Sequence, residues 1–221
     1  MRLALALAIA TPFGAADFHF GIKGGVPLTS YFETGSIGGL RGHRDYSAAT
    51  RRYTAGFTAD YTFSDRLALR VDALYRRMGY VSSSSAAPGF VWHVYDVRGN
   101  SFDFPATVLV RVRRHLAVFA GGGAVVRYVR PSQVKAERII RNLPGFTGDP
   151  VQPLEPLRNP EELEKRVHAG TTATVRIDIP KGRVTVAPEV RYTRWLSNVN
   201  TPLELLRFAP NQAEVLLGVT F

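Results

Sequence analysis

The chain ends in the stretch NQAEVLLGVTF, residues Asn211 to Phe221. Successive side chains of an extended strand point to opposite faces, so every second residue shares a face. One face of this stretch is wholly apolar and consists of Ala213, Val215, Leu217, Val219 and Phe221. The other face is mostly polar or small, with Leu216 as its exception. This pattern is typical of a strand with lipid on one side and a polar interior on the other.

Seven earlier segments repeat this alternation of apolar and polar residues. They are predicted as strands over residues 17–28, 53–63, 66–75, 101–113, 116–128, 167–179 and 183–193. In the fifth segment, Gly121-Gly122-Gly123 predicts a bend or a close approach between backbones. In the seventh, Pro188 offers no N–H group to a neighbouring strand, and we expect a β-bulge there. With the C-terminal segment, the chain carries eight predicted strands, an even number.

The connections between these strands alternate between short and long. About three residues follow the second, fourth and sixth strands, whereas the other connections span residues 29–52, 76–100, 130–166 and 195–210. Such alternation places tight turns at one end of a barrel and long loops at the other, with both termini at the turn end. The predicted fold is all-β: an eight-stranded antiparallel up-and-down transmembrane β-barrel with short periplasmic turns and long extracellular loops.

The composition excludes several classes of protein. The 221 residues are 45% hydrophobic and 21% charged, which suits one folded domain and not a disordered chain. Cysteine is absent, so the chain has neither a disulfide nor a thiolate metal site. The net charge of +10 is spread along the chain without a block of like charges. We therefore expect no nucleic-acid partner and favour a basic surface that meets anionic lipid headgroups.

The first sixteen residues resemble a signal peptide. Arg2 supplies a positive charge, Leu3 to Ala10 form an apolar region, and Gly14-Ala15-Ala16 are small residues that precede a cleavage site. We expect residues 1–16 to be removed on export and residues 17–221 to form the barrel. The alternative is a buried N-terminal helix or strand. No other stretch is apolar enough for a spanning helix.

Together these features resemble the small bacterial outer-membrane β-barrels of the OmpA/OmpX type. The resemblance rests on the signal-like start, the eight alternating segments, the alternation of loop lengths and the closing Val219-Thr220-Phe221. It implies localisation in the cell outer membrane of a Gram-negative bacterium. It also implies that the C-terminal strand ending at Phe221 is recognised by the barrel-assembly machinery. The larger members carry a peptidoglycan-binding domain, which we do not expect here because nothing follows Phe221.

The strand faces opposite the lipid gather charged residues. The acidic members are Asp60, Asp72, Asp103, Asp178, Glu189 and Glu214, and the basic members are Lys23, Arg70, Arg111, Arg127, Arg176 and Arg191. An eight-stranded barrel is just wide enough for its own side chains to fill. We therefore predict a plug of ion pairs, with an arginine as the partner of Glu214. The alternatives are a narrow ion or proton path, or acid–base chemistry by a pair such as Asp60 and Asp72.

Some barrels of this size are enzymes that modify outer-membrane lipid, and these need a serine, a histidine and a carboxylate in contact. The histidines are His19, His43, His93, His115 and His168. We place His43 and His93 in loops, His115 in a turn and His168 inside the barrel, none with a serine on the same strand face. Ser82 to Ser85 are interpreted as a flexible linker. We expect no catalytic, cofactor-binding or metal-ligating residue and no cofactor, and the lipid-modifying enzyme remains an alternative, beside a soluble lipocalin-like carrier.

The predicted loops carry aromatic and basic side chains that suit a membrane surface. The first two loops contain Arg41, His43, Arg44, Arg51, Arg52, Phe90, Trp92, Tyr95 and Arg98. Such residues bind lipopolysaccharide or a partner surface, or form an aromatic belt at headgroup level. In the third loop, Pro160 followed by acidic residues predicts one short helix over 160–165. We expect a monomer with a structural or surface-interaction role, in contact with outer-membrane lipid and lipopolysaccharide.

Overall fold

The computed structural model describes residues 17–39, 42–49, 53–87, 91–113, 117–140, 151–154, 166–196 and 208–221. The predicted signal peptide (1–16), the predicted helix (160–165) and five candidate residues, Arg41, Arg51, Arg52, Phe90 and His115, lie outside these ranges. Among the described residues, no helix is long and apolar enough to cross a membrane.

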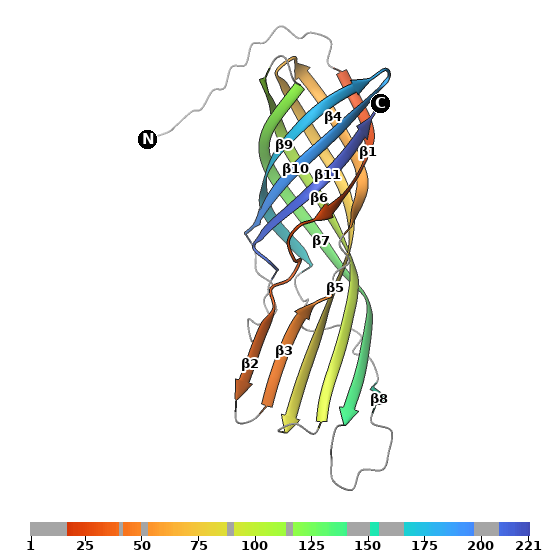
Figure 1. The fold of residues 1–221 in the computed structure, drawn as a ribbon, viewed down its shortest axis with the longest axis vertical. Helices are drawn as coiled ribbons and strands as arrows, with labels where there is room; N and C mark the ends of the chain where they lie inside the picture. Colours follow the sequence, from red (N-terminus) through yellow and green to blue (C-terminus); the bar gives the residue numbers. More distant parts are fainter. Residues whose placement is uncertain are drawn as a thin grey trace, which may run out of the picture.

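Eight strands close into a barrel (Figure 1). They are β1 (Asp17–Pro27), β4 (Thr54–Ser64), β5 (Leu67–Ala87), β6 (Val91–Arg113), β7 (Ala117–Ile140), β9 (Val167–Lys181), β10 (Val184–Trp195) and β11 (Asn211–Thr220). Each pairs antiparallel with the next barrel strand along the chain, and the pairing of β1 with β11 closes the ring. The predicted up-and-down order of eight strands is confirmed.

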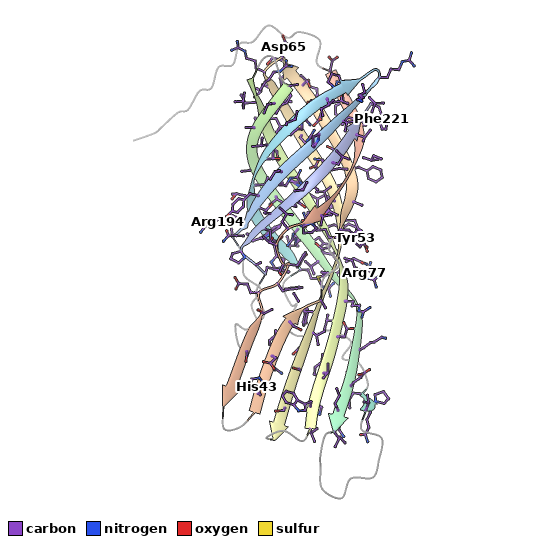
Figure 2. All side chains as sticks on the ribbon, viewed as in Figure 1. His43, Tyr53, Asp65, Arg77, Arg194 and Phe221 are labelled. Atoms are coloured by element: carbon purple, nitrogen blue, oxygen red, sulfur yellow. The ribbon has the colours of Figure 1, made fainter. Side chains whose placement is uncertain are left out.

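Tight connections lie at one end of the barrel, which we call the turn end. Asp65-Arg66 joins β4 to β5, and Gly182-Arg183 joins β9 to β10. Gly182 has a φ of 66°, a left-handed conformation that glycine adopts without steric cost. The C-terminal Phe221 lies at the same end as Asp65 (Figure 2). The opposite end, which we call the loop end, carries the longer connections.

Three barrel strands, β5, β6 and β7, continue beyond the loop end and form a second structure (Figure 1). There they pair with β2 (Gly35–Gly39), β3 (Gly42–Ala48) and β8 (Val151–Leu154) in the order β2-β3-β5-β6-β7-β8. We call this part the protruding sheet. The sequence predicted loops in these segments, and that prediction is wrong because the extensions lack the apolar alternation that marks lipid-facing strands.

The serine run Ser82 to Ser85 illustrates this correction. It was predicted as a flexible linker, but it lies in β5, paired with β3 on one side and with β6 on the other. Ser82 and Ser85 are buried. Backbone pairing on both edges holds this segment extended, although serine itself gives no strand signal.

Two predictions about backbone irregularities had different outcomes. A side-chain carbon built on Gly121 or Gly123 would overlap a carbonyl oxygen of β6, so the predicted close approach of backbones is confirmed. The bulge expected at Pro188 is absent from β10: Val186 faces Ile179 and Glu189 faces Arg176 in one unchanged register. The proline therefore omits a hydrogen bond without adding a residue.

The barrel is polar inside and apolar outside. Large apolar side chains face outward and stay exposed, among them Phe20, Phe57, Val112, Val190 and Leu217. Charged and hydroxyl side chains face inward and are buried. A cluster of buried apolar residues lies instead beyond β1, towards the protruding sheet, and contains Tyr31, Phe32, Tyr46, Met78, Tyr80, Val97, Val129 and Phe208.

Candidate functional site

The centre of the lumen is an ion network around Glu189. Its carboxylate accepts hydrogen bonds from Lys23 Nζ at 2.9 Å, from Arg70 Nη1 at 2.8 Å and from Arg191 Nη2 at 2.7 Å. These four side chains come from β1, β5 and β10, and none is more than 3% exposed. The network thus joins strands from opposite parts of the sequence.

Two aspartates complete this central network. Asp72 accepts from Lys23 Nζ at 2.8 Å and also pairs with Arg191. Asp60 binds Arg70 through both oxygens, at 2.6 and 2.7 Å, and Arg176 at 2.8 Å. Paired and hydrogen-bonded charges of this kind are tolerated in a buried interior, whereas single ones are not.

A second group of ion pairs fills the lumen near the loop end. Asp103 binds Arg127 through both oxygens at 2.7 and 2.8 Å and lies 3.2 Å from Arg76. Arg76 also donates to Glu214 at 2.6 Å, so the predicted arginine partner of Glu214 is confirmed. Arg76 itself was missed, because the third strand was predicted to end at Tyr75. The two-residue period that places Arg70 and Asp72 inside also reaches Arg76, but the neighbouring Arg77 breaks the apolar face at that point.

The two remaining predicted lumen residues lie near the turn end. Asp178 pairs with Arg176 at 2.7 Å, and the Arg111 guanidinium lies 5.8 Å from the centre of the Phe119 ring. They line a hollow of about 450 Å³ at the turn end, together with His19 and Phe221. This hollow ends against the central network.

The lumen is therefore built as a plug. Asp60 and Asp72, the pair considered for acid–base work, are each held by two cationic side chains and not by one another. Both carboxylates are therefore engaged in separate ion pairs, and neither is placed to pass a proton to the other. The arrangement favours the predicted structural role over a proton path.

An aromatic cap covers the loop-end side of this plug. It consists of Tyr31 and Phe32 from the segment after β1, Tyr80 of β5 and Phe208 from the segment before β11. Phe32 stacks on Phe208 at 5.0 Å between ring centres and meets Tyr80 at 5.4 Å. Ala209 N donates to Tyr31 O at 3.0 Å, which ties the two segments together. Burial raises the pKa of the Tyr31 hydroxyl.

Arg127 joins the aromatic cap to the ion plug. Its guanidinium carbon lies 3.9 Å from the Trp195 ring centre and 4.3 Å from that of Tyr31. The same guanidinium donates to Gln212 Oε1 at 3.0 Å besides its two bonds to Asp103. Stacking on aromatic faces and forked hydrogen bonding are properties of arginine that lysine does not share.

Two of the histidines occupy different places from those predicted. His43 and His93 lie in strands of the protruding sheet, not in loops, because β3 and β6 extend there. His168 is buried inside the barrel as predicted, 4.5 Å from the Phe208 ring. Among the described residues, no three His, Cys, Asp or Glu side chains are grouped to hold a metal ion.

Two histidines of the protruding sheet face a serine on a neighbouring strand, contrary to the sequence-based prediction: His93 faces Ser84, and His43 faces Ser85. His43 is paired across the ladder with Ser85, and its Nε2 lies 2.9 Å from Asp45 Oδ1. The prediction failed because His43 and Ser85 were both assigned to loops, where no shared face is defined. The Nδ1 atom of His43 points towards Gly38 on β2, on the other side of β3 from Ser85. A serine nucleophile needs its base within hydrogen-bonding distance. The His43 ring does not meet this requirement, because its Nε2 faces Asp45 and its Nδ1 points away from Ser85.

The strand count, the closure and the segregation of turns from loops define the fold class of the small outer-membrane barrels, as the sequence predicted. The structure is similar to Ail, the attachment invasion locus protein of Yersinia pestis, at 10% identity, covering 92% of this chain and 97% of that chain with a TM-score of 0.35. It is also similar to the outer membrane protein OprG of Pseudomonas aeruginosa, at 13% identity, 93% and 95% coverage and a TM-score of 0.45. The translocator domain of the autotransporter NalP of Neisseria meningitidis matches at 11% identity, 94% and 88% coverage and a TM-score of 0.32. No family model and no curated protein matches the sequence.

Proposed function

We propose that this protein is an outer-membrane barrel that anchors the protruding sheet at the cell surface, and that the sheet binds extended segments of partner proteins along a free edge. The barrel supports this role as a closed anchor. The plug and the aromatic cap fill its lumen, which leaves the protruding sheet as the part that is accessible to a macromolecule.

The outer surface of the barrel supports insertion in a membrane. Phe57 is 69% exposed and Phe20 61% exposed, whereas Arg70 on the inner face is 1% exposed. A soluble lipocalin-like barrel has the opposite arrangement, with its apolar face inside. Strands β1, β4, β10 and β11 have 11, 11, 12 and 10 residues. A tilted strand needs about 9–11 residues to cross a bilayer.

The observation that carries the proposal is the length of β5, β6 and β7, which have 21, 23 and 24 residues. Since about half of that length crosses a membrane, the remainder of each strand stands outside it. The chain thus extends a regular sheet beyond the anchor, where flexible loops would have been sufficient to connect the strands.

The protruding sheet has one edge that suits strand addition. Among the residues that the structure describes, β2 is paired with β3 alone, so its other edge presents backbone N–H and C=O groups to an incoming strand. Four of its five residues are glycine or serine, so Ile37 is the one bulky residue of this strand. At the other edge, β8 contains Pro153, which lacks an N–H group. We therefore assign partner binding to β2.

The assembly machinery is a second proposed partner. In the folded barrel β11 is paired with β1 and with β10, so neither of its edges is free. Recognition of the strand that ends at Phe221 then takes place before the barrel closes.

Cell fractionation tests the membrane anchor. The protein should sediment with the outer membrane, and an unboiled sample should migrate differently from a boiled one because the closed barrel resists detergent. Recovery in the soluble periplasmic fraction, with no change of mobility on heating, would contradict the proposal.

Peptide binding tests the edge of β2. The probe is a fluorescent peptide with the sequence of β3, GHRDYSA, and the readout is its polarisation with the protein in uncharged detergent. Wild type and Ser36→Thr should bind it saturably, whereas Ser36→Pro should lose binding because proline removes a backbone donor and breaks strand pairing. Equal binding by Ser36→Pro, or no saturable binding by wild type, would refute strand addition.

A further inference from the structure

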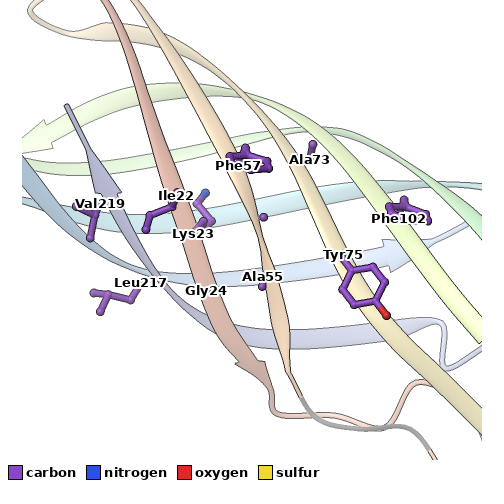
Figure 3. Close-up of a pocket in the computed structure, with 11 residues that line it drawn as sticks. Ile22, Lys23, Gly24, Ala55, Phe57, Ala73, Tyr75, Phe102, Leu217 and Val219 are labelled. Carbon is purple, nitrogen blue, oxygen red and sulfur yellow. The ribbon is translucent and has the colours of Figure 1, made fainter.

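The outer face of the barrel carries a hollow that is separate from the lumen and from the protruding sheet (Figure 3). Its volume is about 890 Å³, and its lining is almost wholly apolar. The hollow follows a row of outward residues that are paired across five strands: Leu217, Gly24, Ala55, Tyr75 and Phe102. The small residues stand in the middle of this row, between larger ones.

The floor and walls of the hollow follow from residue size. A side-chain carbon built on Gly24 would find no atom nearer than Thr54 O at 3.7 Å, so the space above this glycine is open. Ile22 and Phe57 border the hollow on its turn-end side. They face one another across β1 and β4, two residues nearer the turn end than Gly24 and Ala55. Ligand pockets typically have volumes of about 300–1,000 Å³. An apolar hollow of this size suits a hydrocarbon chain.

The loop-end border of the hollow is polar. The Tyr75 hydroxyl donates to Asn100 Oδ1 at 2.9 Å, and the Tyr53 ring lies 6.3 Å from that of Tyr75. Arg77 lies two residues beyond Tyr75 on the same face of β5 and opposite Asn100 on β6. Tyr53 and Arg77 lie at the same level along the barrel (Figure 2). Within the described part of the chain, no carboxylate forms an ion pair with Arg77.

We propose that this hollow and its polar border bind lipid A, with one acyl chain over Gly24 and Ala55 and a phosphate at Arg77. The assignment rests on the proposed membrane orientation. Gly24 and Ala55 lie near the loop ends of β1 and β4, which places the hollow in the outer leaflet. Arg77 supplies the charge that complements a phosphate. Tyr53 and Tyr75 are amphipathic aromatic residues of the kind that is enriched at the membrane interface.

Native mass spectrometry of the refolded protein in uncharged detergent tests this site. The probes are lipid A and the same lipid A after enzymatic removal of its phosphates. Arg77→Gln should lower the retention of lipid A about fivefold, the effect of one basic residue at an anionic lipid surface, and leave the dephosphorylated probe unchanged. Gly24→Leu and, independently, Ala55→Leu should cause loss of both probes by filling the hollow.

Matched controls separate the site from general effects. Arg194→Gln removes an exposed arginine of β10 near the same level, and Ala173→Leu enlarges an outward residue of β9; both should retain lipid A like wild type. The heat-dependent mobility shift confirms that each variant is folded.

Several results would overturn the lipid A site. The first is an equal loss of lipid A retention in Arg77→Gln and Arg194→Gln, and the second is full retention of lipid A in Gly24→Leu and Ala55→Leu. The third is retention of phosphatidylglycerol as strong as that of lipid A. The fourth is a dimer of the protein that covers the hollow and excludes lipid. Any of these in a protein that fractionates with the outer membrane would refute the lipid site alone. Recovery in the periplasm would instead refute the proposed anchor.

Discussion

At the scale of single residues, Lys23 shows how the lumen depends on complete pairing. Its ammonium lies between Asp72 at 2.8 Å and Glu189 at 2.9 Å, with all three side chains fully buried. Lys23→Met should lower the free energy of unfolding by about 3–5 kcal/mol, because it leaves buried negative charge without its partner. Urea titration of the refolded protein measures this difference.

The control for Lys23→Met is a pair at the surface. Arg98 and Asp96 form an ion pair at 2.8 Å on the exposed part of β6. Exposed pairs are screened by water and salt, so Arg98→Ala should leave the urea midpoint nearly unchanged. A loss of stability in Arg98→Ala as large as that in Lys23→Met would contradict the special role of the lumen network.

The sequence predicts which residues face the lumen but not how they pair. Alternation along a strand places Arg70 and Glu189 inside, since a two-residue period is enough to assign a face. Their contact spans 119 positions of sequence and exists only because β5 and β10 lie across a closed ring. The aromatic cap was missed for the same reason. Tyr31 and Phe208 stand outside any strand, and only the folded chain brings them together.

At the scale of strands, the glycines of β7 make a sharp prediction. A side-chain carbon on Gly123 would overlap the carbonyl oxygen of Ala106, whereas one on Gly122 would lie 3.4 Å from Thr172 O, an ordinary contact. Gly123→Ala should therefore destabilise or prevent barrel formation, and Gly122→Ala should be tolerated. The yield of the heat-shiftable species on refolding distinguishes the two. Equal yields would show that β6 and β7 adjust without cost.

The end of β11 makes a second prediction. Phe221 is 63% exposed on the outer face, and its backbone N–H donates to Phe20 O at 2.8 Å. Phe221→Ser should slow insertion into the outer membrane sharply while leaving the refolded barrel close to wild type, because the change removes an outward side chain and no strand pairing. Pulse-chase labelling with the heat shift as readout measures assembly. An unchanged assembly rate would show that β11 is only another strand.

The barrel parts of the strands were predictable, and their extensions were not. Predicted and observed bounds of β1, β4, β9, β10 and β11 agree within two residues, because lipid outside and charge inside impose a strict alternation. In the protruding sheet both faces meet water or a small core, so polar runs such as Ser82 to Ser85 carry no periodic signal. Pairing with neighbouring strands, which is a tertiary property, decides the structure there.

At the scale of the whole molecule, the filled lumen predicts an absence of conductance. The central ion network, the second group of pairs and the aromatic cap follow one another along the barrel axis. Protein reconstituted in planar lipid bilayers at neutral pH should show no discrete channel steps above background. Regular steps that disappear on heat denaturation would contradict the plug and revive the ion-path alternative.

The continuity of β6 and β7 from the turn end to the tip of the protruding sheet also has a mechanical consequence. A pull on the tip acts along these strands, while the hydrogen bonds between them lie across the direction of the force. Such tension shears many bonds together, whereas a sideways pull would break them in succession. The ladder is irregular between Arg98 and Gly99, so yielding under tension should begin there. In the proposed function, these strands would act as a tether that transmits force from a captured partner directly into the membrane anchor.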